Sequence, residues 1–256
     1  MDTIRVLLAQ LQSLPTLLLV LGAAWTLAMI AVPILGWTLG EGAERLGISL
    51  GVVAQTVFVA AVLLTYLPTV TAILVIVTIP VLGWLFELIG SRTGVPFGRY
   101  EYTDVLKPQI GHVPLIVPAA WLMMIPASAA VGQLLVPGGP SALQLLVAAL
   151  AFTAWDLFLD PQMVLWGFWR WKKPGGYFGI PFINFFGWFL CGLLAILVLT
   201  VILPDTACFL PVWPLFAVYV LTWFFQTTAQ LAFWKLYGPG AVGFIGMGIF
   251  IALVVL

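Results

Sequence analysis

The sequence predicts an all-α, polytopic integral membrane protein with about eight transmembrane helices, and three observations lead to this fold class. The 256-residue chain is 63% hydrophobic, and only 7% of it is charged, whereas a soluble domain carries about 25% charged residues. Eight apolar runs follow one another along the chain. The basic residues fall almost entirely on one side of those runs, as they do in oriented membrane proteins.

The apolar runs are the predicted spans, because a helix needs about 20 mostly apolar residues to cross the hydrocarbon. In chain order they are 14–37, 50–67, 69–90, 112–135, 142–160, 184–203, 211–234 and 239–256. The first run is too long for the core of a signal peptide, so we expect it to be a spanning helix. Residues 1–256 are therefore interpreted as a single transmembrane domain.

Basic residues predict the orientation of the eight spans. Arg5 is the one basic residue on the amino-terminal side. The opposite side holds the rest, namely Arg45, Arg92, Arg99, Lys107, Arg170, Lys172, Lys173 and Lys235. By the positive-inside rule the second side is cytoplasmic and both termini are non-cytoplasmic. The two long connections, about 91–111 and 161–183, then both lie at the cytoplasmic face of a multi-pass protein of the cell membrane.

Composition also excludes several classes of protein. A water-soluble enzyme is excluded by the apolar content, and a nucleic-acid-binding protein by a net charge of zero with scattered basic residues. Cys191 and Cys208 form no C-x-x-C motif, so neither a disulfide framework nor a thiolate metal site is indicated. His112 is the sole histidine, which excludes multi-histidine zinc and iron sites, and we expect it in a loop or at a helix entry.

Three carboxylates lie inside or at the edge of apolar runs, where ionisable residues are functional candidates. Glu87 lies near the end of the third run, and Asp156 and Asp160 end the fifth. The two Asp are spaced i,i+4 and share one helical face, and Pro161 predicts the end of that helix. Two close carboxyls in a low dielectric do not both ionise readily, so this pair could serve as a general acid. The structural alternative is an ion-pair network with Arg99, Arg170 or Lys172.

Two further segments allow two interpretations each. The aromatic stretch 161–171, followed by Lys172 and Lys173, suits either an interfacial anchor or a wall of a lipid-facing site. Thr222, Gln226 and Gln230 form a polar stripe on one face of the seventh span. We expect the stripe to hydrogen-bond neighbouring helices, and its alternative role is a lining that holds water in a cavity.

The two long connections carry long sequence signatures. The first is GVPFGRYEYTD at 94–104, followed by GHVP at 111–114. The second runs through AWDLFLDP at 154–161, GFWRW at 167–171, PGGYFGIP at 174–181 and NFFGW at 184–188. Over residues 84–190 the chain thereby resembles the membrane-integral carotenoid 1,2-hydratases, a group of carotenoid biosynthesis proteins that includes bisanhydrobacterioruberin and γ-carotene 1′-hydratases.

This resemblance implies addition of water to the terminal C1=C2 double bond of an acyclic carotenoid, which gives a tertiary alcohol. Protonation of the alkene would form a tertiary cation that water captures, with one of Asp156 and Asp160 as acid and the other as its ionised partner. Glu101 or Asp104 would orient the water or take its proton. The expected substrate-binding residues are Trp155, Trp169 and Tyr177, whose rings would face the cation, together with Tyr100, Arg99, Asn184 and Glu87.

The expected partners are a carotenoid in the bilayer, water and other membrane enzymes of the carotenoid pathway, with no cofactor, metal or nucleic acid. Three alternatives stay open. Asp156, Asp160, Glu101 and Asp104 could together hold Mg²⁺ for an intramembrane prenyltransferase. A carotenoid cyclase would share the cation and differ in its capture. A non-enzymatic lipid or carotenoid transporter or scaffold would use the acidic pair structurally.

Overall fold

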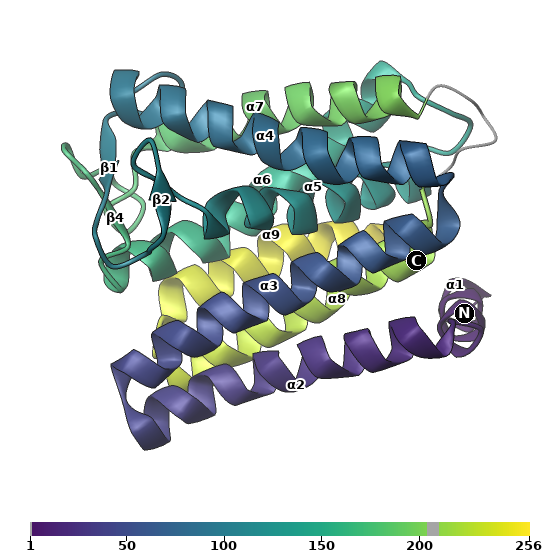
Figure 1. The fold of residues 1–256 in the computed structure, drawn as a ribbon, viewed down its shortest axis with the longest axis horizontal. Coiled ribbons are helices and arrows are strands. Elements are labelled where there is room, and N and C mark those ends of the chain that lie inside the picture. The colour runs from purple at the N-terminus through teal and green to yellow at the C-terminus, as the bar shows by residue number, and fades with distance from the viewer. Residues whose placement is uncertain (1, 204–209) are drawn as a thin grey trace.

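The computed structural model describes residues 2–203 and 210–256, and it is nearly all helical (Figure 1). A short helix that the sequence did not predict, α1 (Asp2–Gln12), precedes eight long ones. These are α2 (Thr16–Leu39), α3 (Glu41–Tyr66), α4 (Thr69–Thr93), α5 (Ile116–Leu135), α6 (Ala142–Leu165), α7 (Phe182–Ile202), α8 (Val212–Thr228) with its π-helical extension η1 (Ala229–Phe233), and α9 (Tyr237–Val255). Within the described residues all eight are long and apolar enough to cross a membrane, in agreement with the predicted number of spans.

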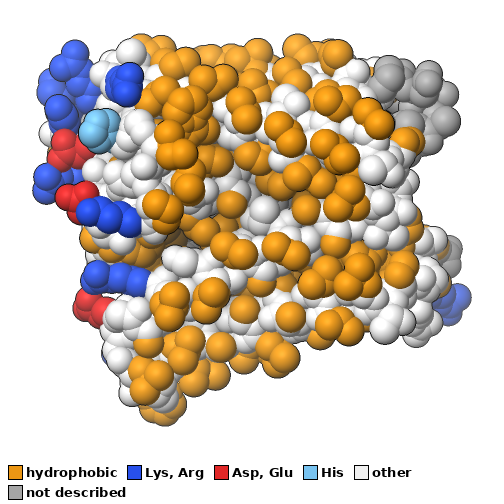
Figure 2. Space-filling view, in the orientation of Figure 1, with side chains coloured by type: hydrophobic (Ala, Val, Ile, Leu, Met, Phe, Trp, Pro, Cys, Tyr) orange, Lys and Arg blue, Asp and Glu red, His pale blue; other side chains and the backbone are white. Residues whose placement is uncertain are grey.

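Helix α5 is the centre of the bundle. It packs against α3, α4, α6, α7, α8 and α9, and 78% of its most apolar stretch is buried inside the protein. Helix α2 lies at the edge and packs mainly on α3. The outer faces of the bundle are covered with hydrophobic side chains (Figure 2). Such a surface suits a lipid environment, because in water it would form an apolar patch far larger than soluble proteins expose.

The two ends of the bundle differ in charge. Both chain termini lie at one end in Figure 1, and the ladder of strands β1 (Tyr100–Tyr102) and β4 (Trp169–Trp171) lies at the opposite end. Lys, Arg, Asp and Glu side chains gather at the β1–β4 end, which we call the charged end (Figure 2). The two long connections are therefore at the same end, as predicted. That this end faces the cytoplasm stays a prediction.

Helix α3 begins at Glu41 rather than at residue 50, so Arg45 lies in its second turn and not in a connection. Gly40, with φ of 84°, is the whole link between α2 and α3. The hydropathy run excluded the first turn because it carries Glu41 and Glu44. These acidic residues suit a helix start, where the backbone N–H groups concentrate positive charge.

The prediction that helix α6 ends at Pro161 is wrong. The helix continues to Leu165 with the proline inside it. Proline has no N–H, so it cannot donate to the carbonyl of Leu157 one turn earlier. The hydroxyl of Tyr177 donates to that oxygen instead, at 2.9 Å. The contact comes from a distant loop, which is why the sequence around Pro161 did not indicate it.

Two short antiparallel ladders interrupt the all-α fold. Strand β1 (Tyr100–Tyr102) pairs with β4 (Trp169–Trp171), so that Tyr100 faces Trp171 and Tyr102 faces Trp169. Strand β2 (Gln109–Ile110) pairs with β3 (Val113–Pro114), and His112 lies in the turn between them, a loop position as expected. Strands of two or three residues are too short to show the alternation of side chains that would predict them from the sequence. Their effect is to join the two signature-bearing connections at one place.

The polar stripe on α8 and η1 makes the expected contacts between helices. Gln55 Nε2 donates to Thr222 Oγ1 at 3.0 Å, and Gln230 Nε2 donates to the Phe158 carbonyl at 2.9 Å. Gln230 Nε2 also reaches Gln162 Oε1 at 3.3 Å. Two amide oxygens of the stripe, Gln226 Oε1 and Gln230 Oε1, are buried without a hydrogen-bond partner among the described residues.

Candidate active site

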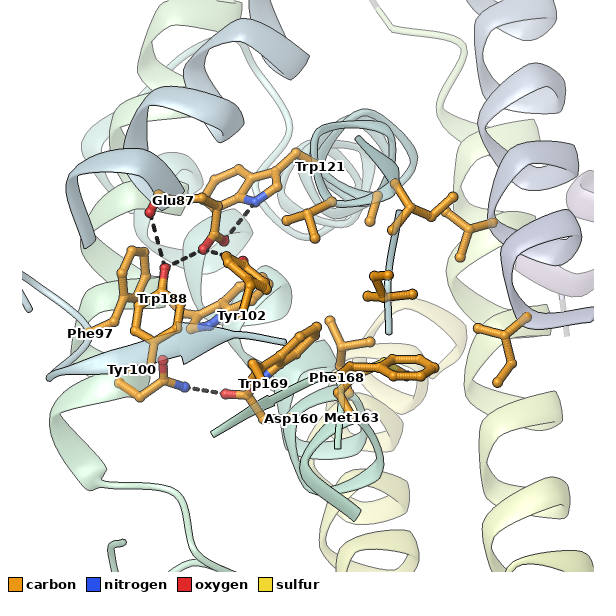
Figure 3. Close-up of a pocket in the computed structure, with 18 of the residues that line it drawn as sticks. Glu87, Phe97, Tyr100, Tyr102, Trp121, Asp160, Met163, Phe168, Trp169 and Trp188 are labelled. Atoms are coloured by element: carbon orange, nitrogen blue, oxygen red, sulfur yellow. Dashed lines mark hydrogen bonds between the residues drawn. The ribbon is translucent and has the colours of Figure 1, made fainter. Parts of the chain in front are cut away.

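A cavity of about 740 Å³, counting its open mouth, lies near the charged end and is called here the reaction cavity. It lies between α3, α4, α5, α6 and α7, with the β1–β4 ladder as one wall (Figure 3). Its aromatic lining consists of Phe97, Tyr100, Tyr102, Trp121, Phe168, Trp169, Trp171 and Trp188. Its polar side chains are Glu87, Asp160, Asn184 and Ser49, and no lysine, arginine or histidine is among the described residues that line it.

Glu87 is held on one wall by three donors. Its Oε2 accepts from the hydroxyls of Tyr100 at 2.5 Å and Tyr102 at 2.7 Å, and its Oε1 accepts from Trp121 Nε1 at 3.2 Å (Figure 3). A carboxylate offers about four lone-pair positions. The three bonds therefore fix the orientation of the group and leave Oε1 able to accept one further hydrogen bond.

The phenols that hold Glu87 remain neutral donors. Burial, followed by the negative charge of Glu87, raises the pKa of Tyr100 well above its usual value of 10.0. Burial likewise raises the pKa of Tyr102, with Glu87 as the second cause. Both groups lie in strand β1, so the connection between α4 and α5 supplies two of the three donors to a carboxylate on α4.

Asp160 lies on another wall of the same cavity, and Asn184 links it to Asp156. Asn184 Nδ2 donates to Asp156 Oδ2 at 2.9 Å and also to Asp160 Oδ2. Trp169 Nε1 donates to Asp160 Oδ1 at 3.0 Å. Asp156 is fully buried and Asp160 is 2% exposed. The two carboxyls thus meet at one amide, with Asp160 lining the cavity and Asp156 behind it.

The aromatic walls of the reaction cavity are packed against one another. Trp121 and Trp188 stack with ring centroids 5.5 Å apart and an interplanar angle of 13°. Tyr102 meets Trp169 edge to face at 5.7 Å across the β1–β4 ladder. Aromatic faces attract cations, so such walls tolerate positive charge where no basic side chain competes.

Only some of the sequence-predicted site residues reach the reaction cavity. Five line the reaction cavity, namely Glu87, Tyr100, Asp160, Trp169 and Asn184, and Asp156 is joined to them through Asn184. Glu101 and Asp104 lie outside it. Glu101 is 45% exposed and pairs with Arg170 at 2.7 Å, and Asp104 is 90% exposed and pairs with Lys107 at 3.3 Å.

Three other predicted substrate-binding residues make different contacts. Trp155 packs edge to face on Tyr219 and borders a neighbouring cavity. Tyr177 donates to the Leu157 carbonyl and packs against Phe185. The backbone oxygen of Arg99 accepts from Lys172, which extends the pairing of the two connections. Of Trp155, Trp169 and Tyr177, Trp169 alone lines the reaction cavity.

Several alternatives can be compared with this geometry. Within residues 2–203 and 210–256, Asp156 and Asp160 make no ion pair with a basic residue. The same residues contain no group of three or more His, Cys, Asp or Glu that could hold a metal ion. The aromatic stretch 161–171 forms a wall of the cavity through Phe168, Trp169 and Trp171, which are buried. Cys191 is a buried free thiol, and Cys208 lies outside the described residues.

Trp121, Tyr102 and Trp188 are site residues that sequence reasoning missed as such. Tyr102 lies two residues after Tyr100, so alternation along a strand could have placed both on one face. Trp121 and Trp188 belong to apolar spans in which a tryptophan is unremarkable by itself. The importance of Trp121 comes from its bond to Glu87 on another helix, and Trp188 lines the same cavity and stacks on Trp121.

The fold and the cavity define a class, a polytopic membrane protein with buried carboxyls in an aromatic-walled intramembrane site. The chain belongs to the carotenoid biosynthesis protein family, whose sequence profile matches residues 47–250. It is 36% identical over 115 residues to a bisanhydrobacterioruberin hydratase from Haloarcula japonica. That match covers 43% of this chain and 39% of the relative's length. The family resemblance of the two signatures is thereby confirmed. No solved structure matches the chain.

Proposed function

We propose that this protein is a carotenoid hydratase that adds water across the terminal C1=C2 double bond of an acyclic carotenoid and forms a tertiary alcohol. Membership of the carotenoid biosynthesis family and the hydratase relative support the reaction class. The observation that carries the proposal is the presence of Asp160 and Glu87 on different walls of one aromatic cavity. Acid-catalysed hydration needs two such groups, one to give a proton and one to take one.

The substrate would enter from the bilayer. Helices α3 and α4 leave their shared turn at Leu67 and Pro68 and diverge toward the charged end (Figure 1). Ile48 and Val52 of α3 and Glu87 of α4 line the reaction cavity between these diverging halves. A polyene lying among the lipid chains would insert its terminal isoprene unit there and leave the rest of its length in the membrane.

In the proposed first step Asp160 is the general acid. Its O–H bond breaks and a C–H bond forms at C2, the less substituted alkene carbon, which leaves a tertiary cation at C1. Asp156, held on the same Asn184 amide, is the partner that shares the proton before transfer. Two carboxyls this close in an apolar site favour keeping one proton between them. Trp169 orients Asp160 through its N–H.

In the second step Glu87 positions the water. The water donates one hydrogen bond to the free acceptor position on Glu87 Oε1. The oxygen of that water then forms a bond to C1. The resulting oxonium loses a proton to Glu87, and a later proton transfer back to Asp160 resets the site. This assignment gives Glu87 the role that the sequence suggested for Glu101 or Asp104, because those two carboxylates are exposed and paired at the surface.

The stacked Trp121 and Trp188 and the ring of Trp169 would stabilise the cation by about 0.5–2 kcal/mol each. No cofactor takes part in these steps. The proposal places the protein in the cell membrane with the reaction cavity near the cytoplasmic side, where water is available, beside other membrane enzymes of the pathway. Orientation rests on the basic residues of the charged end.

The test is expression in a bacterium that makes lycopene, followed by mass spectrometry of the extracted pigment. We expect a product heavier by one or two water molecules with an unchanged chromophore, and incorporation of ¹⁸O from labelled water. Cells with the empty vector are the control. An unshifted pigment with lycopene, γ-carotene and the longer acyclic precursors alike would contradict the proposal.

The same assay separates the alternative enzymes. Hydration should survive a chelator, whereas Mg²⁺-dependent prenyl transfer should stop. A cyclase would give a product of unchanged mass with a changed end group. A transporter or scaffold would leave the pigment chemically unaltered.

A further inference from the structure

We propose that a second, polar cavity beside the reaction cavity binds water and delivers it to the cation. This inference rests on the proposed hydration. The reaction cavity has a mostly apolar wall, and the terminal isoprene unit would occupy most of it. The water that Glu87 later positions therefore needs a separate place before the cation forms. Two residues of the polar stripe, Thr222 and Gln226 of α8, line the neighbouring cavity, and the reaction steps above do not use them.

This neighbouring cavity, called here the water chamber, has a volume of about 610 Å³ when its open mouth is counted. Its polar lining is Gln55 of α3, Gln162 of α6, and Thr222 and Gln226 of α8. No charged side chain is among the described residues that line it. Four polar side chains converging between membrane helices are unusual, because each must be satisfied away from water.

The side chain of Gln226 is a separate indication that the chamber binds water. Its Oε1 is buried and has no hydrogen-bond partner among the described residues. A buried polar atom left unpaired costs free energy, and a water molecule in a polar cavity is the usual remedy. Gln55 Nε2 donates one hydrogen bond to Thr222 Oγ1. Gln55 still has its amide oxygen and a second N–H, and Thr222 still has its O–H, so both can bind a water beside Gln226.

The water chamber adjoins the reaction cavity. Five side chains line both, namely Ile48, Val52, Met123, Leu159 and Met163. On α6, Leu159 and Met163 lie between the face that carries Asp160 and the face that carries Gln162. The partition is apolar, and its two methionines have flexible unbranched side chains that can move aside. One rotamer change could therefore connect a stored water to the cation.

At its other side the water chamber reaches toward the charged end. Trp234 lines both the chamber and a surface cavity of about 990 Å³ that Glu44 and Lys235 also line. Trp234 Nε1 donates to Glu44 Oε1, which holds the indole between the two spaces. Trp234 follows the π-helical segment η1, a local irregularity that often accompanies functional sites. This arrangement gives water a route separate from the lipid-side entry of the substrate.

The test uses Gln226→Leu, which removes the polar group without touching Asp160 or Glu87. The assay runs in D₂O and measures two quantities in the extracted pigment, the hydrated product and the deuterium in recovered substrate. Reversible protonation of the alkene exchanges deuterium without needing water capture. We expect the ratio of hydration to exchange to fall about tenfold, since losing one hydrogen bond weakens water binding by about that factor.

Two matched variants complete the design. Gln144→Leu makes the same change at a buried glutamine that bonds the Val136 carbonyl outside the chamber, and it should keep the wild-type ratio. Gln226→Asn keeps an amide in the chamber and should restore most of the ratio. Equal losses of hydration and exchange in Gln226→Leu, or an unchanged ratio, would overturn the water chamber. Wild-type protein that neither hydrates nor exchanges would instead overturn the proposed function itself.

Discussion

Asn184 sets the geometry of the proposed acid. Its Nδ2 carries two protons and donates to both Asp156 and Asp160. A single amide thereby keeps two carboxyls together while Trp169 orients the one that lines the cavity. The asymmetry between the two Asp comes from the packing, because their chemistry and spacing on the helix are equivalent.

Asp160→Asn is expected to reduce hydration by about 100-fold or more, the usual effect of losing a positioned proton donor. Asp156→Asn is expected to cost less, because the residue supports the acid without lining the cavity. Product formation by mass spectrometry, normalised to protein amount, measures both. Glu41→Gln at an exposed helix start is the control. A larger loss in Asp156→Asn would reverse the assignment of acid and partner.

Glu87→Gln and Glu101→Gln separate the two candidates for positioning water. Glu87→Gln should lose about 100-fold in hydration, because the proton acceptor beside the cation is gone. Glu101→Gln breaks an exposed ion pair that is worth about 1 kcal/mol or less, so we expect a loss of no more than a few-fold. If Glu101→Gln lost as much hydration as Glu87→Gln, the surface carboxylate Glu101 would again be a candidate for positioning the water.

At the scale of elements, the close packing of α4 on α5 holds one wall of the cavity. A Cβ added at Gly83 would collide with the ring of Trp121, whose N–H bonds Glu87. Gly83→Ala should therefore displace the indole and lower hydration as much as Trp121→Phe does. Gly42→Ala, where an added Cβ meets nothing within 4 Å, is the control. Full activity of Gly83→Ala would show that Trp121 does not hold Glu87 in place.

Helix α6 depends on a hydroxyl from a loop. Tyr177→Phe leaves the Leu157 carbonyl without the donor that replaces the missing N–H of Pro161, and should lower stability by about 1 kcal/mol. For a chain of this size that shifts Tm by about 2–4 °C. In a Pro161→Ala background the new backbone N–H at position 161 can donate to the Leu157 carbonyl. Tyr177→Phe should therefore lower the stability of that variant by less.

The control for this cycle is Tyr219→Phe. Its hydroxyl donates to the Ala151 carbonyl, which lies in a regular part of α6 where the helix ladder is intact. Thermal unfolding in detergent is the measurement. If Pro161→Ala relieves the loss in Tyr219→Phe as much as the loss in Tyr177→Phe, the Leu157 carbonyl left free by Pro161 is not the reason for the loss.

At the scale of the whole molecule, the orientation in the membrane is a prediction that follows from the distribution of charge. The charged end carries both signature-bearing connections, and the termini lie at the other end (Figures 1 and 2). In a variant without its native cysteines, a cysteine replacing Lys173 should react with a membrane-impermeant maleimide only after the membrane is opened. A cysteine replacing Arg5 should react in intact cells. The reverse pattern would invert the orientation and move the reaction cavity to the outer face.

The sequence alone determined the class, the number of spans and the buried carboxyls. Hydropathy is a local property summed along each run, so the eight helices could be read directly, and their errors fell where charge or proline interrupts a run, at Glu41 and Pro161. The signatures predicted the family because long motifs are recognisable without coordinates. Asp156, Asp160 and Glu87 stood out because carboxylates are costly in an apolar segment.

The tertiary structure alone decided which of these groups meet. Contacts such as those of Trp121 with Glu87, Asn184 with Asp160, and Tyr177 with Leu157 join segments that are distant in sequence, and no local pattern encodes them. It also separated Glu101 from the cavity, because successive residues of strand β1 point to opposite faces. Which neighbours a side chain meets depends on helix packing, and that packing is a property of the whole bundle.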